Sequence, residues 1–219
     1  MYDFIRGPMV WISIAIFFAG IIWQVVRFLS LSRSVEDPKL KRPAGLAAEV
    51  PPAGAGGFFH ALKLSIFKTS PGMIIVTTVF HFCLVAVPLT LLGHNILIER
   101  AIGFSLFSLS ERTSDILTVV FLLCGAFFLY RRLFLPRVRI ITSGYDYLML
   151  LLATAPFITG FLAYHQVLDY KLMIVLHILA GEAMLILAPF TKFVHMVYFF
   201  AVRFTVRSEW ALGSGNRNW

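Results

Sequence analysis

Five long apolar stretches, separated by polar segments, set the pattern of this chain. They run over about residues 7–29, 73–98, 116–135, 145–164 and 170–203. A helix needs about 20 apolar residues to cross the hydrocarbon core of a bilayer, so each stretch is long enough to span it. We therefore predict an all-α integral membrane protein with five transmembrane helices in a bundle. We expect residues 1–219 to form a single membrane domain.

A shorter amphipathic pattern lies between the first two stretches. Phe59, Leu62 and Ile66 recur at helical spacing, and Lys63 and Lys68 lie off that stripe. Such a pattern is typical of a helix that lies on the membrane surface. We predict this surface helix over about residues 57–69.

Composition supports the membrane class. The chain is 59% hydrophobic and 14% charged, with a mean hydropathy of +0.84, whereas a soluble domain has about 25% charged residues. The net charge of +8 comes from loop residues without the aromatic–basic interleaving of a nucleic-acid surface. We therefore expect contact with membrane lipid and no nucleic-acid partner. Cys83 and Cys124 lie inside apolar stretches, and their spacing indicates neither a disulfide framework nor a metal site.

The basic residues predict an orientation. Of the 19 Lys and Arg residues, 15 fall on one side of the predicted membrane and four on the other, namely Arg6, Arg100, Arg112 and Lys171. Because short loops rich in Lys and Arg stay in the cytoplasm, the N-terminus is expected outside and the C-terminus in the cytoplasm.

Four histidines lie inside two of the stretches, His81 and His94 in the second, His177 and His195 in the fifth. His177 and His195 are 18 residues apart, which is five turns, so both leave the same face of a straight helix. Because the two stretches run in opposite directions, depth pairs His94 with His177 and His81 with His195. Two pairs of imidazoles at two depths predict two bis-histidine b haems, with these four residues as axial ligands of the iron.

Three alternatives compete with the haem interpretation. The histidines are helix-interface residues with backbone or hydroxyl partners, or ligands of a zinc ion, or members of a proton relay. Zinc takes three or four ligands at one depth, which these positions do not offer. A relay usually includes carboxylates, and among the acidic residues only Glu182 lies well inside a stretch.

The spacing in the second stretch requires a distortion. His81 and His94 are 13 residues apart, which is a rise of about 20 Å, whereas the two histidines of the fifth stretch are separated by about 27 Å. Thirteen residues also place the two side chains on different faces of a straight helix. We expect Pro88 to kink the second stretch and Pro189 to bend the fifth.

Glycines beside two of the histidines are candidate cofactor-binding positions. Gly181 follows His177 by one turn, and Gly93 directly precedes His94. Each glycine leaves room for a flat macrocycle near the backbone, and close packing of helices through small residues is the alternative.

Two polar residues complete the candidate site. Lys192, three residues before His195, is a candidate partner for a haem propionate on the cytoplasmic side. His165, at the outer end of the fourth stretch, is a candidate proton acceptor at a quinone site, and a plain loop histidine is the alternative.

Several segments resemble a known family. The run LHILAGEAMLILAPFTKFVHM, with its 18-residue histidine spacing, resembles the last helix of the gamma subunit of respiratory nitrate reductases. The segments MYDFIRGPMVWISI, VFHFCLVAVPLTLLGHNIL and YDYLMLLLATAPFITGFLAYHQ are more similar to the cytochrome b subunits of the Hmc, Tmc and Dsr redox complexes of sulfate-reducing bacteria. The nitrate reductase family has a shorter histidine spacing in its second span, which favours the sulfate-reducer branch.

The resemblance implies a function and a setting. It implies a multi-pass subunit of the bacterial inner (cytoplasmic) membrane that holds two haem b groups and exchanges electrons with menaquinone. The implied partners are other subunits of a respiratory complex, namely a cytoplasmic iron–sulfur protein and a periplasmic multihaem cytochrome c. A membrane anchor or assembly subunit without haem, whose histidines are structural or proton-conducting, is the rival interpretation.

Overall fold

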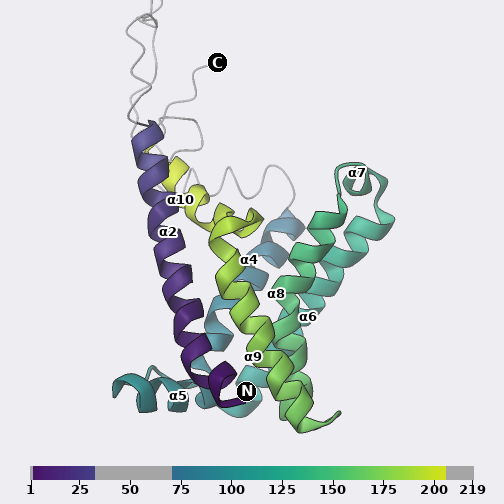
Figure 1. The fold of residues 1–219 in the computed structure, drawn as a ribbon. Helices are drawn as coiled ribbons and strands as arrows, with labels where there is room; N and C mark the ends of the chain where they lie inside the picture. The colour runs from purple at the N-terminus through teal and green to yellow at the C-terminus, as the bar shows by residue number, and fades with distance from the viewer. Residues whose placement is uncertain (1, 33–70, 206–219) are drawn as a thin grey trace, which may run out of the picture. The chain divides into compact units, whose positions relative to one another are not determined.

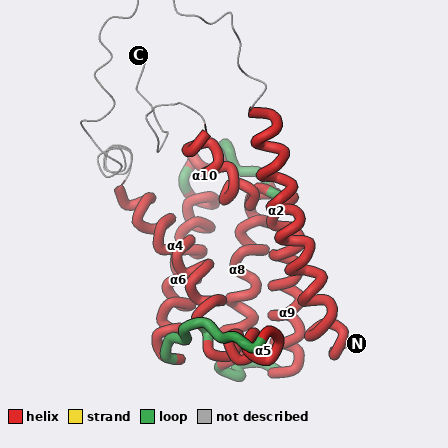
Figure 2. The backbone as a smooth tube through the Cα atoms, turned by 90° about the vertical axis from the view of Figure 1, so that its left-hand side faces the viewer, coloured by secondary structure: helices red, strands yellow, loops and turns green. Residues whose placement is uncertain are grey.

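The computed structural model describes residues 2–32 and 71–205. These residues are helices joined by short connections, and no strand occurs among them (Figure 2). The elements in chain order are α1 (Tyr2–Phe4), the π-helical turn η1 (Ile5–Met9), α2 (Val10–Ser32), α4 (Pro71–Thr90), α5 (Leu92–Ile102), α6 (Glu111–Phe134), α7 (Pro136–Arg139), α8 (Gly144–Tyr164), α9 (Tyr170–Leu187), η3 (Ala188–Phe190), η4 (Lys192–Val194) and α10 (His195–Thr205). The predicted surface helix over residues 57–69 lies outside the described residues.

Within the described residues, five helices are long and apolar enough to cross a membrane, the number that the sequence predicts. The qualifying segments are Ile5–Leu31, Pro71–Thr90, Glu111–Phe134, Gly144–Tyr164 and Tyr170–Phe190. Large apolar side chains on these helices are exposed, among them Phe18, Ile22 and Phe82, which suits surfaces that contact lipid. This is the arrangement of a multi-pass membrane protein.

Two of the predicted spans differ from the structure. The second ends at Thr90 rather than at 98, because Leu91 has extended backbone (φ −69°, ψ 126°) and α5 starts a separate helix. The fifth is not one helix from 170 to 203, because α9 ends at Leu187 and two 3-10 turns separate it from α10. His177 and His195 therefore do not belong to one straight helix, and the five-turn argument for a shared face is wrong.

The chain forms two compact units, each with its own interior. The first is Met1–Val10 with Gly72–Met184, and the second holds, among the described residues, 11–32 and 185–205. The first unit thus contains four apolar helices, α4, α6, α8 and most of α9, seen in Figure 1.

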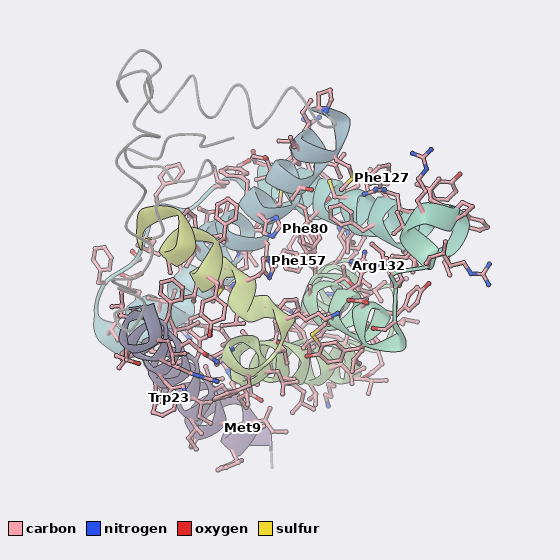
Figure 3. All side chains as sticks on the ribbon, turned by 90° about the horizontal axis from the view of Figure 1, so that it is seen from above. Met9, Trp23, Phe80, Phe127, Arg132 and Phe157 are labelled. Atoms are coloured by element: carbon pink, nitrogen blue, oxygen red, sulfur yellow. The ribbon has the colours of Figure 1, made fainter. Side chains whose placement is uncertain are left out.

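Stacked aromatic rings form the core of the first unit. Phe121 of α6 is fully buried and stacks on Phe80 of α4 at 4.5 Å and on Phe157 of α8 at 3.9 Å between ring centroids. Figure 3 labels the two outer rings of this stack, Phe80 and Phe157. A Cβ added at Gly125 of α6 would lie 3.0 Å from Cγ2 of Thr154 in α8, so the small residue lets these helices approach closely.

Local signals fix where the helices of the first unit begin and end. The Ser110 side chain caps α6 by accepting from the Thr113 amide, and Ser143 and Asp146 form a capping box at the start of α8. α5 ends at Gly103, whose φ of 74° suits glycine and whose amide donates to the Glu99 carbonyl. Within the unit, α4 and α8 end, and α6 and α9 start, at the same end (Figure 1).

Candidate functional site

Two of the four predicted ligand histidines meet in the first unit. The rings of His94, on α5, and His177, on α9, lie with centroids 5.8 Å apart and planes 19° from parallel. The pairing of His94 with His177 by depth is thereby confirmed as a spatial pairing. It is made possible by the break at Leu91, which frees His94 from the direction of α4.

Backbone carbonyls of two prolines hold these rings. His94 Nδ1 lies 2.8 Å from the Pro88 carbonyl oxygen, and His177 Nδ1 lies 2.7 Å from the Pro156 carbonyl oxygen. A carbonyl only accepts hydrogen bonds, so each Nδ1 carries the proton and each Nε2 carries a lone pair. Two such rings cannot satisfy each other's Nε2 by hydrogen bonding, because both atoms are acceptors.

The freed carbonyl of Pro88 explains the first of these contacts. In a continuous helix the Pro88 carbonyl would accept from the amide of Leu92 four residues on. The extended backbone at Leu91 interrupts that ladder. The break that redirects the chain therefore also releases the acceptor that orients His94.

Gly160 leaves space for the His177 ring. A Cβ added at Gly160 would lie 2.9 Å from both Cε1 and Nδ1 of His177, closer than real side chains approach. Gly160 is one turn after Pro156 on α8, so the same helix supplies both the carbonyl and the gap. The sequence analysis did not identify these two groups, because a backbone carbonyl and a missing side chain leave no chemical signature in the sequence.

The other two histidines show the same backbone contact. His81 Nδ1 lies 2.8 Å from the Thr77 carbonyl oxygen in the first unit. His195 Nδ1 lies 2.7 Å from the Lys192 carbonyl oxygen in the second. Each contact makes Nδ1 the donor and gives Nε2 the lone pair. All four predicted ligands therefore share one tautomer, and the Lys192 backbone joins the candidate site alongside its exposed side chain.

Neither Gly93 nor Gly181 serves close helix packing. A Cβ added at either position would meet no described atom within 4 Å. The alternative weighed for these glycines, close approach of two helices, therefore finds no support in the described residues. Their predicted role beside a macrocycle stays a prediction.

His165 forms an ion-pair geometry at the same end of the first unit. Its Nε2 lies 2.8 Å from Oδ1 of Asp115, and the two side chains are 36% and 33% exposed. Beside it, the Tyr164 hydroxyl donates to Oε2 of Glu111 at 2.9 Å. His165 therefore differs from the four predicted ligand histidines, because its partner is a carboxylate rather than a carbonyl.

A pair of Nε2 atoms with lone pairs suits one iron bound from two sides. A metal–imidazole bond is about 2 Å long, so two rings on opposite sides of a metal have centroids about 6 Å apart. The 5.8 Å spacing of His94 and His177 fits that value. Their second nitrogens are held by backbone carbonyls, the usual support of a metal-bound histidine. Among the described residues, no group of three or more His, Cys, Asp or Glu side chains gathers as a metal site.

Comparison with known proteins identifies a relative of similar length. No family profile matches the chain. A protein of Nitratidesulfovibrio vulgaris (strain Hildenborough), whose name is given only as "Protein", is 37% identical over 226 residues, which cover 98% of this chain and 96% of the relative.

Proposed function

We propose that this chain, which belongs to the same family as the Nitratidesulfovibrio vulgaris protein, is a membrane cytochrome b with two bis-histidine b haems. It transfers electrons between menaquinone and partner redox subunits of a respiratory complex. It lies in the bacterial inner membrane with its N-terminus outside and its C-terminus in the cytoplasm. Its partners are a cytoplasmic iron–sulfur protein and a periplasmic multihaem cytochrome c.

The pairing of His94 with His177 is the observation that carries the proposal. The Pro88 and Pro156 carbonyls accept the Nδ1 protons, which leaves a lone pair on each Nε2. The two rings lie with centroids 5.8 Å apart and are nearly parallel. An iron bound by both Nε2 atoms accounts for the ring spacing, the tautomers and the gap at Gly160 together.

The protein's own groups set the properties of this site. A bound haem supplies one-electron transfer. The two proline carbonyls fix ring orientation and raise the basicity of Nε2, which favours the oxidised iron. Gly160 leaves the space that the His177 ring occupies beside α8.

The second haem is assigned to His81 and His195. Each has the Nδ1–carbonyl contact of a ligand histidine, to Thr77 and Lys192 respectively. Their pairing rests on the depth argument from the sequence. The Lys192 side chain is proposed to neutralise a propionate of this haem.

Asp115 and His165 are proposed as the proton acceptor of a quinol. With Nε2–H directed to the carboxylate, His165 Nδ1 carries the lone pair that accepts a proton. The carboxylate stabilises the imidazolium that forms. Both side chains are partly exposed, so the proton has a route out.

A reduced-minus-oxidised absorption spectrum of the purified full-length chain tests the proposal. The α band of b haem is expected, with two haems per chain by pyridine haemochrome assay. Absence of the band would leave the haem-free anchor as the better interpretation. His94→Ala and His177→Ala are each expected to remove the same single haem, and the double variant no more than one.

His165→Ala is the matched control, because it changes a histidine at the same end of the first unit. It is expected to retain both haems. Loss of a haem in this variant, or retention of both in His94→Ala, would contradict the assignment of ligands.

A further inference from the structure

The break before His195 is bridged by a side chain from another helix. α9 ends at Leu187, and the chain passes through two 3-10 turns with extended backbone at Thr191 (φ −120°, ψ −171°) before α10 begins at His195. In a continuous helix the Pro189 carbonyl would accept from the Phe193 amide. That amide instead reaches the Thr191 hydroxyl at 3.5 Å.

Gln24 of α2 takes the released carbonyl. Its Nε2 donates to the Pro189 oxygen at 2.7 Å. Its Oε1 accepts from the Tyr198 hydroxyl of α10, also at 2.7 Å. One amide therefore bonds Pro189 within the break and Tyr198 beyond it, and it satisfies the Pro189 carbonyl that the break releases.

The surroundings of this amide are built for the contact. Gln24 is buried, and Pro189 is among the most completely buried residues of the described chain. A Cβ at Gly20, one turn before Gln24, would lie 2.5 Å from Cγ of Pro189. Only glycine at that position lets the proline ring pack against α2. A buried amide is costly unless both of its polar atoms are paired, and here both are.

We propose that Gln24 is a positioning residue for His195, and this inference rests on the proposed function of His195 as a haem ligand. Tyr198 is three residues after His195, on the adjacent turn of α10. Fixing Tyr198 and Pro189 fixes both ends of the seven-residue segment 188–194 that delivers the imidazole. The Lys192 carbonyl then holds the ring itself. Gln24 thus acts on the haem through His195 without touching it.

Gln24→Leu tests the bridge, because leucine keeps the apolar bulk and removes both hydrogen bonds. The first readout is hydrogen exchange of backbone amides over residues 188–198 in the full-length chain in lipid nanodiscs. We expect exchange there to rise about tenfold, the factor of a single hydrogen bond. Tyr198→Phe is expected to give a smaller rise. The double variant is expected to match Gln24→Leu, since both bonds pass through one amide.

The second readout is the midpoint potential of each haem. Gln24→Leu is expected to shift or abolish the haem that His195→Ala removes, and to leave unchanged the haem that His94→Ala removes. Thr118→Val is the matched control, because Thr118 is as buried as Gln24 and its hydroxyl donates to the Ser114 carbonyl of its own helix. It is expected to change neither readout.

The two readouts separate failure of the inference from failure of the proposed function. Unchanged exchange over 188–198 in Gln24→Leu overturns the bridge whether or not haem is present. Raised exchange with both potentials unchanged overturns the positioning role. Raised exchange in a chain whose wild type binds no haem supports the bridge and overturns the proposed function. If Gln24→Leu does not fold, Tyr198→Phe decides by the same criteria.

Discussion

The two helix breaks before the proposed ligand histidines differ in how the proline carbonyl released at each break is hydrogen-bonded. The break at Leu91 follows Pro88, whereas the break over residues 188–194 contains Pro189. Each break precedes a proposed ligand histidine. In the first, the histidine itself takes the released proline carbonyl. In the second, Gln24 of α2 takes it, and the histidine bonds a carbonyl within the break.

The two breaks differ in the sequence separation between the released carbonyl and the residue that bonds it. The carbonyl that orients His94 lies six residues before it in the chain, so the geometry follows from one short segment. The segment before His195 is longer and bonds a residue 165 positions away. We infer that the first site tolerates changes in α2, whereas the second depends on them.

The largest expected effect on haem content is at Gly160. Alanine there places a Cβ 2.9 Å from the His177 ring, and overpacking of this kind costs about 1–3 kcal/mol. The ring must move and lose its bond to Pro156, so we expect Gly160→Ala to lower occupancy of the haem on His94 and His177 about tenfold. Quantitative haem spectra measure this.

Gly144→Ala is the control for that change, because Gly144 lies on the same helix and a Cβ there meets no described atom within 4 Å. Equal haem loss in both alanine variants would show that Gly160 has no special relation to His177. Loss of the other haem in Gly160→Ala would contradict the inference that the two sites depend on different residues.

The corresponding change at the second break is Gly20→Ala. Its Cβ would overlap the Pro189 ring, so Pro189 must shift away from Gln24. We expect a shifted midpoint potential for the haem assigned to His195 and an unchanged potential for the other. Redox titration measures both. Gly7→Ala, whose Cβ meets no described atom within 4 Å, is expected to change neither potential, and a shift of both potentials in Gly20→Ala would argue against two independent sites.

The sequence predicted the five spans and the meeting of His94 with His177 because both depend on long patterns of apolar residues. It also predicted that Pro88 and Pro189 would distort their helices. It did not predict where the helices stop. Pro88 lies inside α4, and the break falls three residues after it, at Leu91. Proline removes a hydrogen bond from the turn before it, so the position of Pro88 alone does not give the position of the break.

The supporting groups of the site were beyond sequence reasoning. The acceptors for His94 and His177 are backbone carbonyls, which every residue carries. In the sequence, Gln24 is a single polar residue in an apolar span. Its partners, Pro189 and Tyr198, are distant in sequence and are identified only by the structure. The side chains with distinctive chemistry were found from the sequence, and the groups that orient them depend on tertiary contacts.

A separate effect, on the rate of quinol oxidation rather than on haem content, concerns the partly exposed pair Asp115 and His165. If His165 accepts the quinol proton, His165→Ala should lower quinol oxidation by about 10²–10⁴-fold, the usual contribution of a positioned base. Asp115→Asn should lower it less, because the imidazole remains. Both haem spectra should stay unchanged, because Asp115 and His165 bond each other, whereas His94 and His177 bond the Pro88 and Pro156 carbonyls. Stopped-flow reduction by a menaquinol analogue measures the rate, and an unchanged rate in His165→Ala would exclude this role.

The smallest expected effect separates two buried polar side chains inside spans. Gln24 has both polar atoms paired, whereas Glu182 is buried and both of its carboxyl oxygens lack a hydrogen-bond partner among the described residues. Removing a paired group leaves its partners unsatisfied and costs about 1–3 kcal/mol, whereas replacing an unpaired one by an apolar group of similar shape is neutral or stabilising. Glu182→Met should therefore leave the thermal midpoint in detergent unchanged or raise it, and Gln24→Met should lower it. A lowered midpoint in Glu182→Met would show that the carboxyl has a partner in the working protein, and the contrast between the two groups would then fail.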